Sequence, residues 1–404
     1  MAKKYKNVRE KNGKYHYRYS IKDANGNRVQ KETPGFASAK EAADAGKIIE
    51  AEILNGTYIA NKKILISEFA DQWLELYKTT NVKERTVDLR KSVVKKIKKK
   101  FGGLKLQELT TARYQKELND LKNNENKSQS TIMNFHVVMK MIFYKALELE
   151  LIKKDITQYV TLPSFSKTVE ELEINDDLPE YLEKEELAIL LQKSKELDSP
   201  QAFRVLFVLA YTGMRIGELC ALKLKDVDEV NKKISITKTL YVPGKLKHYK
   251  LNTPKNKSSI RKIDVSSRVI SIIKEQIAWK NKFRLEYRRW FNDESDFIFF
   301  TEGSLMGYPL RLYEAENYMS DALKATGIGY PLTPHSLRHT YTSLMAEAGV
   351  ELEAIQKLLG HSSDHTTKAV YLHVTKARRR AAVEKLDSLM DGVIQTWDFC
   401  GKDE

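Results

Sequence analysis

The stretch of sequence that decides the fold is His335-Ser336-Leu337-Arg338-His339. It is followed by Leu-Gly-His at residues 359–361 and by Tyr371, and a second arginine, Arg215, lies far upstream in YTGMRIGEL at residues 211–219. Guanidinium and imidazole groups bind phosphate, and a tyrosine hydroxyl can attack phosphorus when cations stabilise its phenolate. Two separated arginines, two histidines and one tyrosine in this order therefore predict a site that acts on a phosphate ester.

The pentapeptide lies near the start of a predicted helix. Thr333-Pro334 is a typical helix start, and Gly349 is a typical stop. The buried stripe of this helix is expected to be Leu337, Tyr341, Leu344 and Ala348. On that pattern His335 and Arg338 project together off the core, near a helix N-terminus that favours phosphate. The next helix is expected to end at Gly360, which leaves the histidine after it on irregular backbone.

Arg215 is expected to lie just past a core helix. Residues 203–211 are apolar apart from Arg204, which predicts a core helix, and Gly213 predicts the turn that ends this helix. An arginine at the edge of a core needs an anionic partner, and Glu218 lies one turn further on. One reading is a purely structural ion pair between the two residues. The other is that Arg215 binds two phosphate oxygens while Glu218 supports it.

Tyr371 is distinguished only by its position among 20 tyrosines. Tyrosine has a pKa of about 10 in water, so at neutral pH it needs cations or a base to act as a nucleophile. Arg215 and Arg338 would offset negative charge on the transition state, and His335 would transfer a proton. With His361, these residues form the predicted catalytic set around the nucleophile Tyr371.

These motifs resemble the catalytic domain of the tyrosine recombinases, the family of phage and conjugative-transposon integrases. The resemblance covers residues from about 65 to 386. It implies a 3′-phosphotyrosyl link and a free 5′ hydroxyl, formed without a metal or ATP. It also implies a hairpin lysine that protonates the leaving 5′ oxygen. In the matching hairpin, residues 251–261, Lys255 is the first choice for that lysine and Lys257 the alternative, while Lys257 and Arg261 are candidates for DNA contact.

The composition points to a large polyanionic partner. A chain of 404 residues suggests two or three domains, and 69 basic against 54 acidic residues give a net charge of +15. The longest apolar run, residues 205–211, is far shorter than the roughly 20 residues that span a bilayer, so nucleic acid is favoured over a membrane. Cys220 and Cys400 show neither a disulfide framework nor metal-ligand spacing, which fits a reducing bacterial cytoplasm.

The first 60 residues predict a small sheet followed by one helix. Residues 14–21 alternate with period two, residues 23–27 predict a turn, and residues 28–33 return as a strand. Ser38 is expected to cap a helix that runs to about Leu54. Two readings are open. The sheet either packs on its helix as an ordinary amphipathic sheet, or it resembles the arm-binding domain of integrases and enters a DNA groove with Tyr15, Tyr17, Tyr19, Arg18 and Arg28.

Residues 65–161 predict an almost entirely helical module that resembles the core-binding domain of the same family. Between Arg90 and Lys100, seven of eleven residues are basic and none is acidic. Such a run is often only a solvated face, but clustered like charges repel unless a polyanion offsets them. The DNA-contact candidates here are Lys95, Lys96, Lys98 and Lys99. A second candidate surface is the polar helix entry at residues 127–131.

The remaining chain predicts a mixed, mainly helical α+β catalytic domain at residues 180–386, after a linker at residues 162–179. Its expected helices include 183–195, 200–211 and a basic helix to about residue 291, and its expected strands are 233–241, 259–265 and 297–301. The tail, residues 387–404, is apolar at helical spacing. It either packs on its own domain or docks on a neighbouring protomer, as in related recombinases.

The favoured function is that of a site-specific integrase that works as a homotetramer on double-stranded DNA, at core and arm attachment sites, and that integrates or excises a mobile element or prophage. A non-enzymatic DNA-binding regulator would share the charge but would not need the arginine, histidine and tyrosine set. A type IB topoisomerase would share the chemistry without joining two sites. An excisionase and a host DNA-bending protein are left open as further partners.

Overall fold

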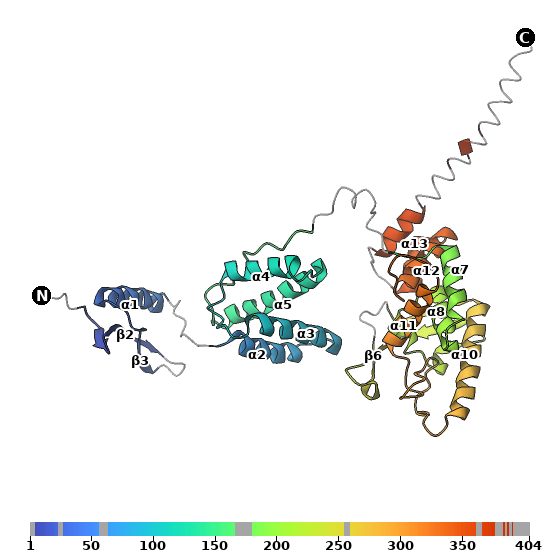
Figure 1. Cartoon of the computed structure of the whole chain (residues 1–404), viewed down its shortest axis with the longest axis horizontal. Coiled ribbons are helices and arrows are strands. Elements are labelled where there is room, and N and C mark those ends of the chain that lie inside the picture. Colours follow the sequence, from blue (N-terminus) through green and yellow to red (C-terminus); the bar gives the residue numbers. More distant parts are fainter. Residues whose placement is uncertain are drawn as a thin grey trace, which may run out of the picture. The chain divides into compact units, whose positions relative to one another are not determined.

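The computed structural model describes residues 5–22, 27–55, 64–165, 180–253, 259–360 and 366–375, together with residues 383, 386, 387 and 390. The chain divides into two compact units, Met1–Ser166 and Lys167–Glu404. Figure 1 shows the elements of each unit, coloured in chain order. Within the described ranges, no helix is both long enough and apolar enough to cross a membrane.

The N-terminal domain is a three-stranded antiparallel sheet, in the order β1-β2-β3, packed against one helix. Its elements are β1 (Val8–Lys11), β2 (Lys14–Lys22), β3 (Arg28–Glu32) and α1 (Ala39–Leu54). Ser38 caps α1 by accepting a hydrogen bond from the Glu41 amide at 3.2 Å. The two predicted strands and the predicted helix are therefore confirmed, while most of the predicted turn, residues 23–26, lies outside the described residues.

The tyrosine side of this sheet faces α1. Tyr17 is 5% exposed, and its hydroxyl donates to Glu50 Oε1 at 2.7 Å. α1 approaches so closely that a Cβ on Gly46 would lie 2.2 Å from the Tyr17 ring. Tyr17 is therefore not presented to a groove, because its ring fills the interface between sheet and helix. Arg18 follows it on the opposite face of β2, where its side chain is 34% exposed and pairs with Glu32 at 3.4 Å.

Residues 64–165 form the predicted helical module. Its helices are α2 (Ile66–Thr79), α3 (Glu84–Phe101), α4 (Thr111–Asn123) and α5 (Gln129–Glu148). Phe69 and Trp73 of α2 belong to one apolar core together with Ile97 of α3 and Phe143 of α5. The chain stays packed against this core as far as Phe165.

The C-terminal unit combines helices with two small antiparallel sheets, β4-β5-β8 and β6-β7. Its helices are α7 (Lys184–Ser194), α8 (Pro200–Thr212), α9 (Ile216–Leu219), α10 (Ser267–Glu286), α11 (Leu312–Lys324), α12 (Ser336–Glu347) and α13 (Leu352–Leu359). Its strands are β4 (Val227–Asp228), β5 (Lys233–Ile236), β6 (Thr239–Tyr241), β7 (Lys250–Asn252) and β8 (Arg261–Asp264). Residues 366–375 are also helical. The expected fold class is confirmed.

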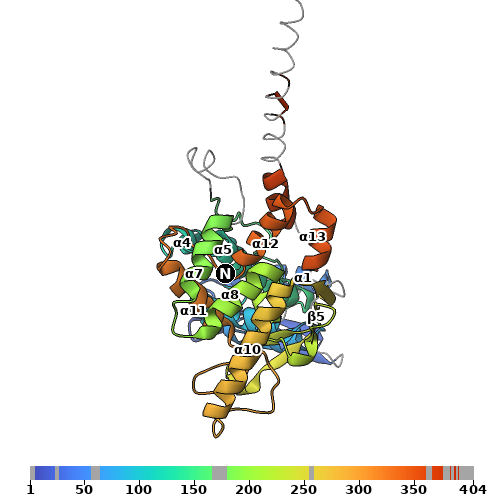
Figure 2. The ribbon, with the colours of Figure 1, turned by 90° about the vertical axis from the view of Figure 1, so that its right-hand side faces the viewer.

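α8 lies at the centre of this unit. It packs against α7, α10, α11 and α12, which surround it in Figure 2. Residues 205–210 of α8 are almost completely buried, as its unbroken apolar sequence predicts. The turn at its C-terminal end therefore follows a helix that is buried in the core.

Residues 297–301 were predicted to be a strand, but they are a buried segment that forms only isolated bridges. The side chain of Gln201 donates to the Phe300 carbonyl at 2.9 Å and accepts from the Phe300 amide at 3.0 Å. Gln276 donates to the Ile298 carbonyl at 3.1 Å. Side-chain amides therefore satisfy backbone groups that a neighbouring strand would otherwise pair.

Three other boundaries also differ from the prediction. The expected strand 233–241 is divided into β5 and β6, which belong to different sheets, and α10 ends at Glu286. α12 begins at Ser336 and not at Pro334. The reason lies in the preceding turn, where the Ser336 amide donates to the Thr333 carbonyl at 2.8 Å and the Ser336 hydroxyl accepts from the Thr333 amide at 3.2 Å.

Candidate active site

The turn after α8 brings the two predicted arginines together. Gly213 ends α8 with a φ of +61°, and its carbonyl accepts from Arg338 Nη1 at 2.6 Å. Arg215, two residues later, caps α9. A Cβ on Gly213 would lie 2.6 Å from the Tyr341 ring and 2.7 Å from the Leu359 side chain, so only glycine fits. One turn thus carries the first arginine and anchors the second.

Arg338 is 2% exposed and lies in the interior. Its second hydrogen bond runs from Nη2 to the Leu359 carbonyl at 2.6 Å. The prediction that Arg338 projects off the core with His335 is wrong, because α12 is buried on most of its surface, including Thr340 and Thr342. Ala348, which was expected in the buried stripe, is exposed.

Glu218 is a buried carboxylate held between two arginines. Its side chain is 4% exposed, and it accepts from Arg215 Nη1 and from the Arg215 backbone amide, both at 2.9 Å. Arg261 donates to both carboxylate oxygens, at 3.0 and 3.2 Å. Burial raises the pKa of the Glu218 carboxyl, but the hydrogen bonds and charges of Arg261 and Arg215 outweigh burial, so its pKa is lower than usual. Glu218 is therefore ionised at neutral pH.

Arg261 was predicted to contact DNA, but its side chain is buried. Its side chain is 6% exposed, and besides Glu218 it donates from Nε to the Leu358 carbonyl at 2.7 Å. The strand pattern could have revealed this inward direction. Arg261 lies two residues before the buried Ile263 in β8, and alternate residues of a strand share a face.

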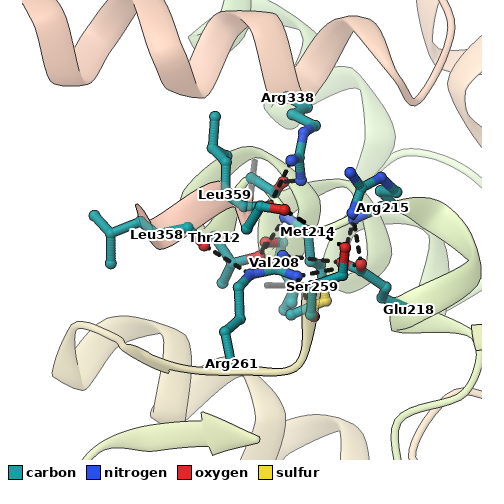
Figure 3. A network of polar contacts seen from close by, with 12 residues as sticks. Val208, Thr212, Met214, Arg215, Glu218, Ser259, Arg261, Arg338, Leu358 and Leu359 are labelled. Atoms are coloured by element: carbon teal, nitrogen blue, oxygen red, sulfur yellow. Dashed lines mark hydrogen bonds and ion pairs between the residues drawn. The ribbon is translucent and has the colours of Figure 1, made fainter. Parts of the chain in front are cut away.

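The C-terminal end of α13 is where these contacts meet. The last carbonyls of a helix have no partner inside it and carry partial negative charge. Here the Leu358 carbonyl accepts from Arg261 and the Leu359 carbonyl from Arg338, while Ser259 Oγ donates to the Gly360 carbonyl at 3.5 Å. Figure 3 shows Arg261 and Arg338 approaching Leu358 and Leu359 at the end of α13, with Arg215 and Glu218 beside them.

Tyr371 belongs to the helical segment 366–375 and is partly buried. It packs in a small apolar cluster with Ile355, Leu359 and Tyr341. Leu359 is also the residue whose carbonyl holds Arg338. The cluster that Tyr371 packs against therefore includes the residue that anchors Arg338.

Of the other predicted catalytic residues, one is exposed and the rest lie outside the described residues. His335 is exposed in the turn before α12, and its ring meets the His339 ring edge-on, with the centroids 4.9 Å apart. Lys255, Lys257 and His361 lie outside the described residues. Among the residues that are described, no cluster of three or more His, Cys, Asp or Glu side chains is suited to hold a metal ion.

Acidic side chains offset more of the positive charge on the basic face of α3 than its sequence suggests. Lys98 pairs with Asp71 of α2 at 2.5 Å, and Lys100 lies between Glu117 and Glu125. The compensating acids come from other parts of the module, so the run from residue 90 to 100 could not reveal them. The exposed members of the predicted set are Lys95, Lys96 and Lys99, and in the N-terminal sheet Arg28 is exposed as well.

Family models match at three places: the Phage integrase family at residues 180–378, a Phage integrase, N-terminal SAM-like domain at residues 65–122, and an Arm DNA-binding domain at residues 6–53. The integrase of Staphylococcus phage L54a is 32% identical over 357 residues, which cover 85% of this chain and 98% of that protein. The prophage ps2 probable integrase of Lactococcus lactis is 30% identical over 396 residues, or 93% and 97% of the two chains.

Solved structures show the same fold. The Tn1549 transposon integrase in complex with a circular intermediate DNA has a TM-score of 0.61 at 22% identity and covers 80% of this chain and 99% of that one. A lambda integrase tetramer bound to a Holliday junction has a TM-score of 0.57 at 16% identity and covers 90% and 94%. By its family models and its similarity to phage integrases over most of its length, the chain belongs to the phage integrase family, the site-specific tyrosine recombinases that cut and rejoin DNA strands.

Proposed function

We propose that Tyr371 is the nucleophile that cleaves the DNA strand and that Arg215 and Arg338 stabilise the reacting phosphate. The tyrosine oxygen bonds to phosphorus, the bond from phosphorus to the 5′ oxygen breaks, and a 3′-phosphotyrosyl link and a 5′ hydroxyl result. Attack by a 5′ hydroxyl then reverses the step on a partner strand. The bond energy stays in the protein link, so rejoining needs no further energy source.

The observation that carries this proposal is the Gly213 turn, which bears Arg215 and holds Arg338 by a 2.6 Å hydrogen bond. Fixed cations stabilise a transition state well because they need no reorganisation as charge develops. Arg215, 35% exposed, is the arginine that reaches the phosphate from the surface. Arg338 adds a buried positive charge, which acts more strongly in a low dielectric than in water.

The proton transfers are assigned to residues around these arginines. His335 takes or returns the proton of Tyr371, and His361 donates a hydrogen bond to the phosphate. Lys255, or Lys257 in its place, protonates the leaving 5′ oxygen. The bond from Ser259 to the Gly360 carbonyl supports this arrangement, because it ties a residue two positions after Lys257 to the residue just before His361.

The whole chain is proposed to be an integrase of a phage or conjugative element, acting in the bacterial cytoplasm as a homotetramer on double-stranded DNA. Residues 1–60 bind arm sites and residues 65–161 bind core sites, the catalytic domain is at 180–386 and the tail at 387–404. The linker expected at 162–179 begins only after Phe165, because residues up to Phe165 pack against the helical module. Support comes from the arm and SAM-like models and from the lambda integrase tetramer. An excisionase or a host DNA-bending protein is proposed as an accessory partner.

The test is a covalent protein–DNA adduct. A duplex that the full-length protein selects from a random library is nicked near the selected site, so that cleavage releases a short strand and traps the link. The wild type should form an adduct on a denaturing gel, without metal or ATP, and Tyr371→Phe should bind DNA but form none. Tyr341→Phe, which removes a hydroxyl from the same apolar cluster, should form the adduct normally.

Three outcomes would contradict parts of this assignment. An adduct formed by Tyr371→Phe would remove Tyr371 as the nucleophile. Binding without any adduct in the wild type would favour a regulator. Relaxation of supercoiled DNA with no joining of two sites would favour a type IB topoisomerase.

A further inference from the structure

The Glu218 carboxylate poses an electrostatic problem for the arginine beside it. A buried carboxylate 2.9 Å from Arg215 Nη1 offsets the positive charge that Arg215 would bring to a phosphate. On its own, the pair of Arg215 and Glu218 has no net charge. A third group must therefore balance Glu218 if Arg215 is to act as a cation.

Arg261 has the geometry to do this. It donates from two nitrogens to both oxygens of Glu218, at 3.0 and 3.2 Å, and both side chains are almost fully buried. Such a two-point contact between guanidinium and carboxylate is among the strongest and most directional of ion pairs. The three groups together carry one net positive charge, and Arg215 is the member that is partly exposed, at 35%.

Arg261 also joins two parts of the site mechanically. Its Nε bonds to the Leu358 carbonyl, one residue before the carbonyl that holds Arg338. It begins β8, which pairs with β5, whereas β7 at the other end of the predicted hairpin 251–261 pairs with β6 in a different sheet, so the two strands do not form the hairpin that was predicted. A shift of Arg261 would therefore move Glu218, and with it Arg215, relative to the end of α13.

We propose that Arg261 is a positioning residue for DNA cleavage, which neutralises Glu218 so that the charge of Arg215 acts on the scissile phosphate. This rests on the proposed role of Arg215. Arg261 itself does not touch DNA, because its side chain is only 6% exposed. Its effect therefore belongs to the rate of cleavage and not to the affinity for DNA.

The experiment compares Arg261→Gln and Arg261→Lys with a control, Lys262→Gln. Lys262 is the next residue of β8 and is exposed, so the control removes one positive charge from the same strand without disturbing Glu218. Single-turnover adduct formation on the nicked duplex is measured at saturating protein. We expect Arg261→Gln to be slower by roughly 100-fold, as for a small displacement of a catalytic group. Arg261→Lys, which keeps the charge but not the two-point contact, should lie between it and the wild type.

A second substrate separates electrostatics from general structural damage. A methylphosphonate at the scissile position replaces one charged phosphate oxygen by a methyl group, so the reacting group starts without negative charge. If Arg261 acts through the charge of Arg215, the defect of Arg261→Gln should shrink at least several-fold on this substrate. Damage to the fold would slow both substrates equally.

Three results would overturn the proposal. An Arg261→Gln variant with weaker DNA binding and a shallower salt dependence would make Arg261 a DNA contact. An equal defect on phosphate and methylphosphonate would make it only structural, and full activity of both variants would remove any role. These results differ from a failure of the proposed function, in which the wild type itself forms no adduct. If Arg261→Gln does not fold, the same comparison is made with Arg261→Lys.

Discussion

The lysines of α3 and the arginines around Glu218 are both clusters of positive charge, but their surroundings are opposite. On α3, Lys95, Lys96 and Lys99 are exposed, and Lys98 meets Asp71 at the surface. Long exposed side chains lose entropy when they are fixed, and salt screens them. They can follow a phosphate backbone, but they cannot fix one phosphorus atom.

Around Glu218 the cations are held by buried acceptors. Arg338 bonds to two main-chain carbonyls, and Arg261 bonds to a carboxylate and a third carbonyl. Main-chain carbonyls at the ends of α8 and α13 move only if those helices move. From the difference between the two regions we predict that exposed lysines provide affinity for DNA, while buried arginines provide the geometry on which the rate of cleavage depends.

The largest effect on the rate of cleavage is expected from Arg338→Lys. A lysine has one nitrogen and cannot reach both the Gly213 and the Leu359 carbonyls as the planar guanidinium does. Adduct formation should fall by roughly 100-fold or more, the loss typical of removing one preorganised donor. DNA affinity, measured by titration, should stay close to that of the wild type. If Arg338→Lys lowered the affinity for DNA and left the rate of cleavage unchanged, the buried arginines would not differ in role from the lysines of α3.

Glu218→Gln should lower stability strongly. Removing one member of a buried ion pair leaves uncompensated charge and destabilises a protein by about 3 to 5 kcal/mol. The matched control is Asp71→Asn, which removes the exposed partner of Lys98 and should change stability by less than about 1 kcal/mol. Both free energies of unfolding come from denaturant titrations at pH 7.

The difference in unfolding free energy between the wild type and Glu218→Gln should depend on pH, because the pKa of Glu218 is lowered. The folded carboxyl has a pKa below its usual value of 4.5, so its contribution is complete above pH 4.5 and is lost as the pH falls through the folded pKa. The gap between wild type and Glu218→Gln should therefore narrow below pH 4.5. A gap that stays constant down to pH 3 would show that the charge of Glu218 is not its source.

Much of the fold follows from local patterns. The Ser38 cap, the stops at Gly213, Gly349 and Gly360, and the pairing of Arg215 with Glu218 all depend on residues within a few positions of each other. The sheet-and-helix domain and the helical module were likewise expected from periodicity. These features are local, so the sequence around each one contains the information that determines it.

The burial of Arg338 could not be predicted in the same way. Arg338 donates to a main-chain carbonyl 125 positions away. The main-chain carbonyl is the same in every residue, so no residue type marks the acceptor. Gln201 similarly replaces a strand partner for Phe300, 99 positions away. Distant contacts to main-chain atoms leave no local pattern, and it is these contacts that separate the site arginines from ordinary surface charge.

Gly213→Ala tests whether the anchoring turn is as rigid as its contacts suggest. A Cβ there meets the Tyr341 ring at 2.6 Å in a left-handed backbone, so we expect a loss of about 2 to 4 kcal/mol in unfolding free energy. Gly244→Ala is the control, because Gly244 has a φ of +82° with nothing within 4 Å of the added carbon. Its unfolding free energy should fall only by the cost of placing alanine in a left-handed backbone conformation, about 1 to 2 kcal/mol. Equal losses at both positions would mean that the packing around Gly213 yields easily.

The smallest effect is expected from Lys96→Gln on α3. An exposed lysine that contacts one phosphate contributes about 0.9 to the slope of log affinity against log salt, and its loss weakens binding by less than about tenfold at moderate salt. The rate of adduct formation at saturating protein should not change, because the bound DNA meets the same arginines. Lys98→Gln, in which the lost charge was already paired with Asp71, should reduce the slope less. If Lys96→Gln instead slowed cleavage of fully bound DNA, affinity and geometry would not be separate properties of the two regions, and the helical module would itself help to place the phosphate.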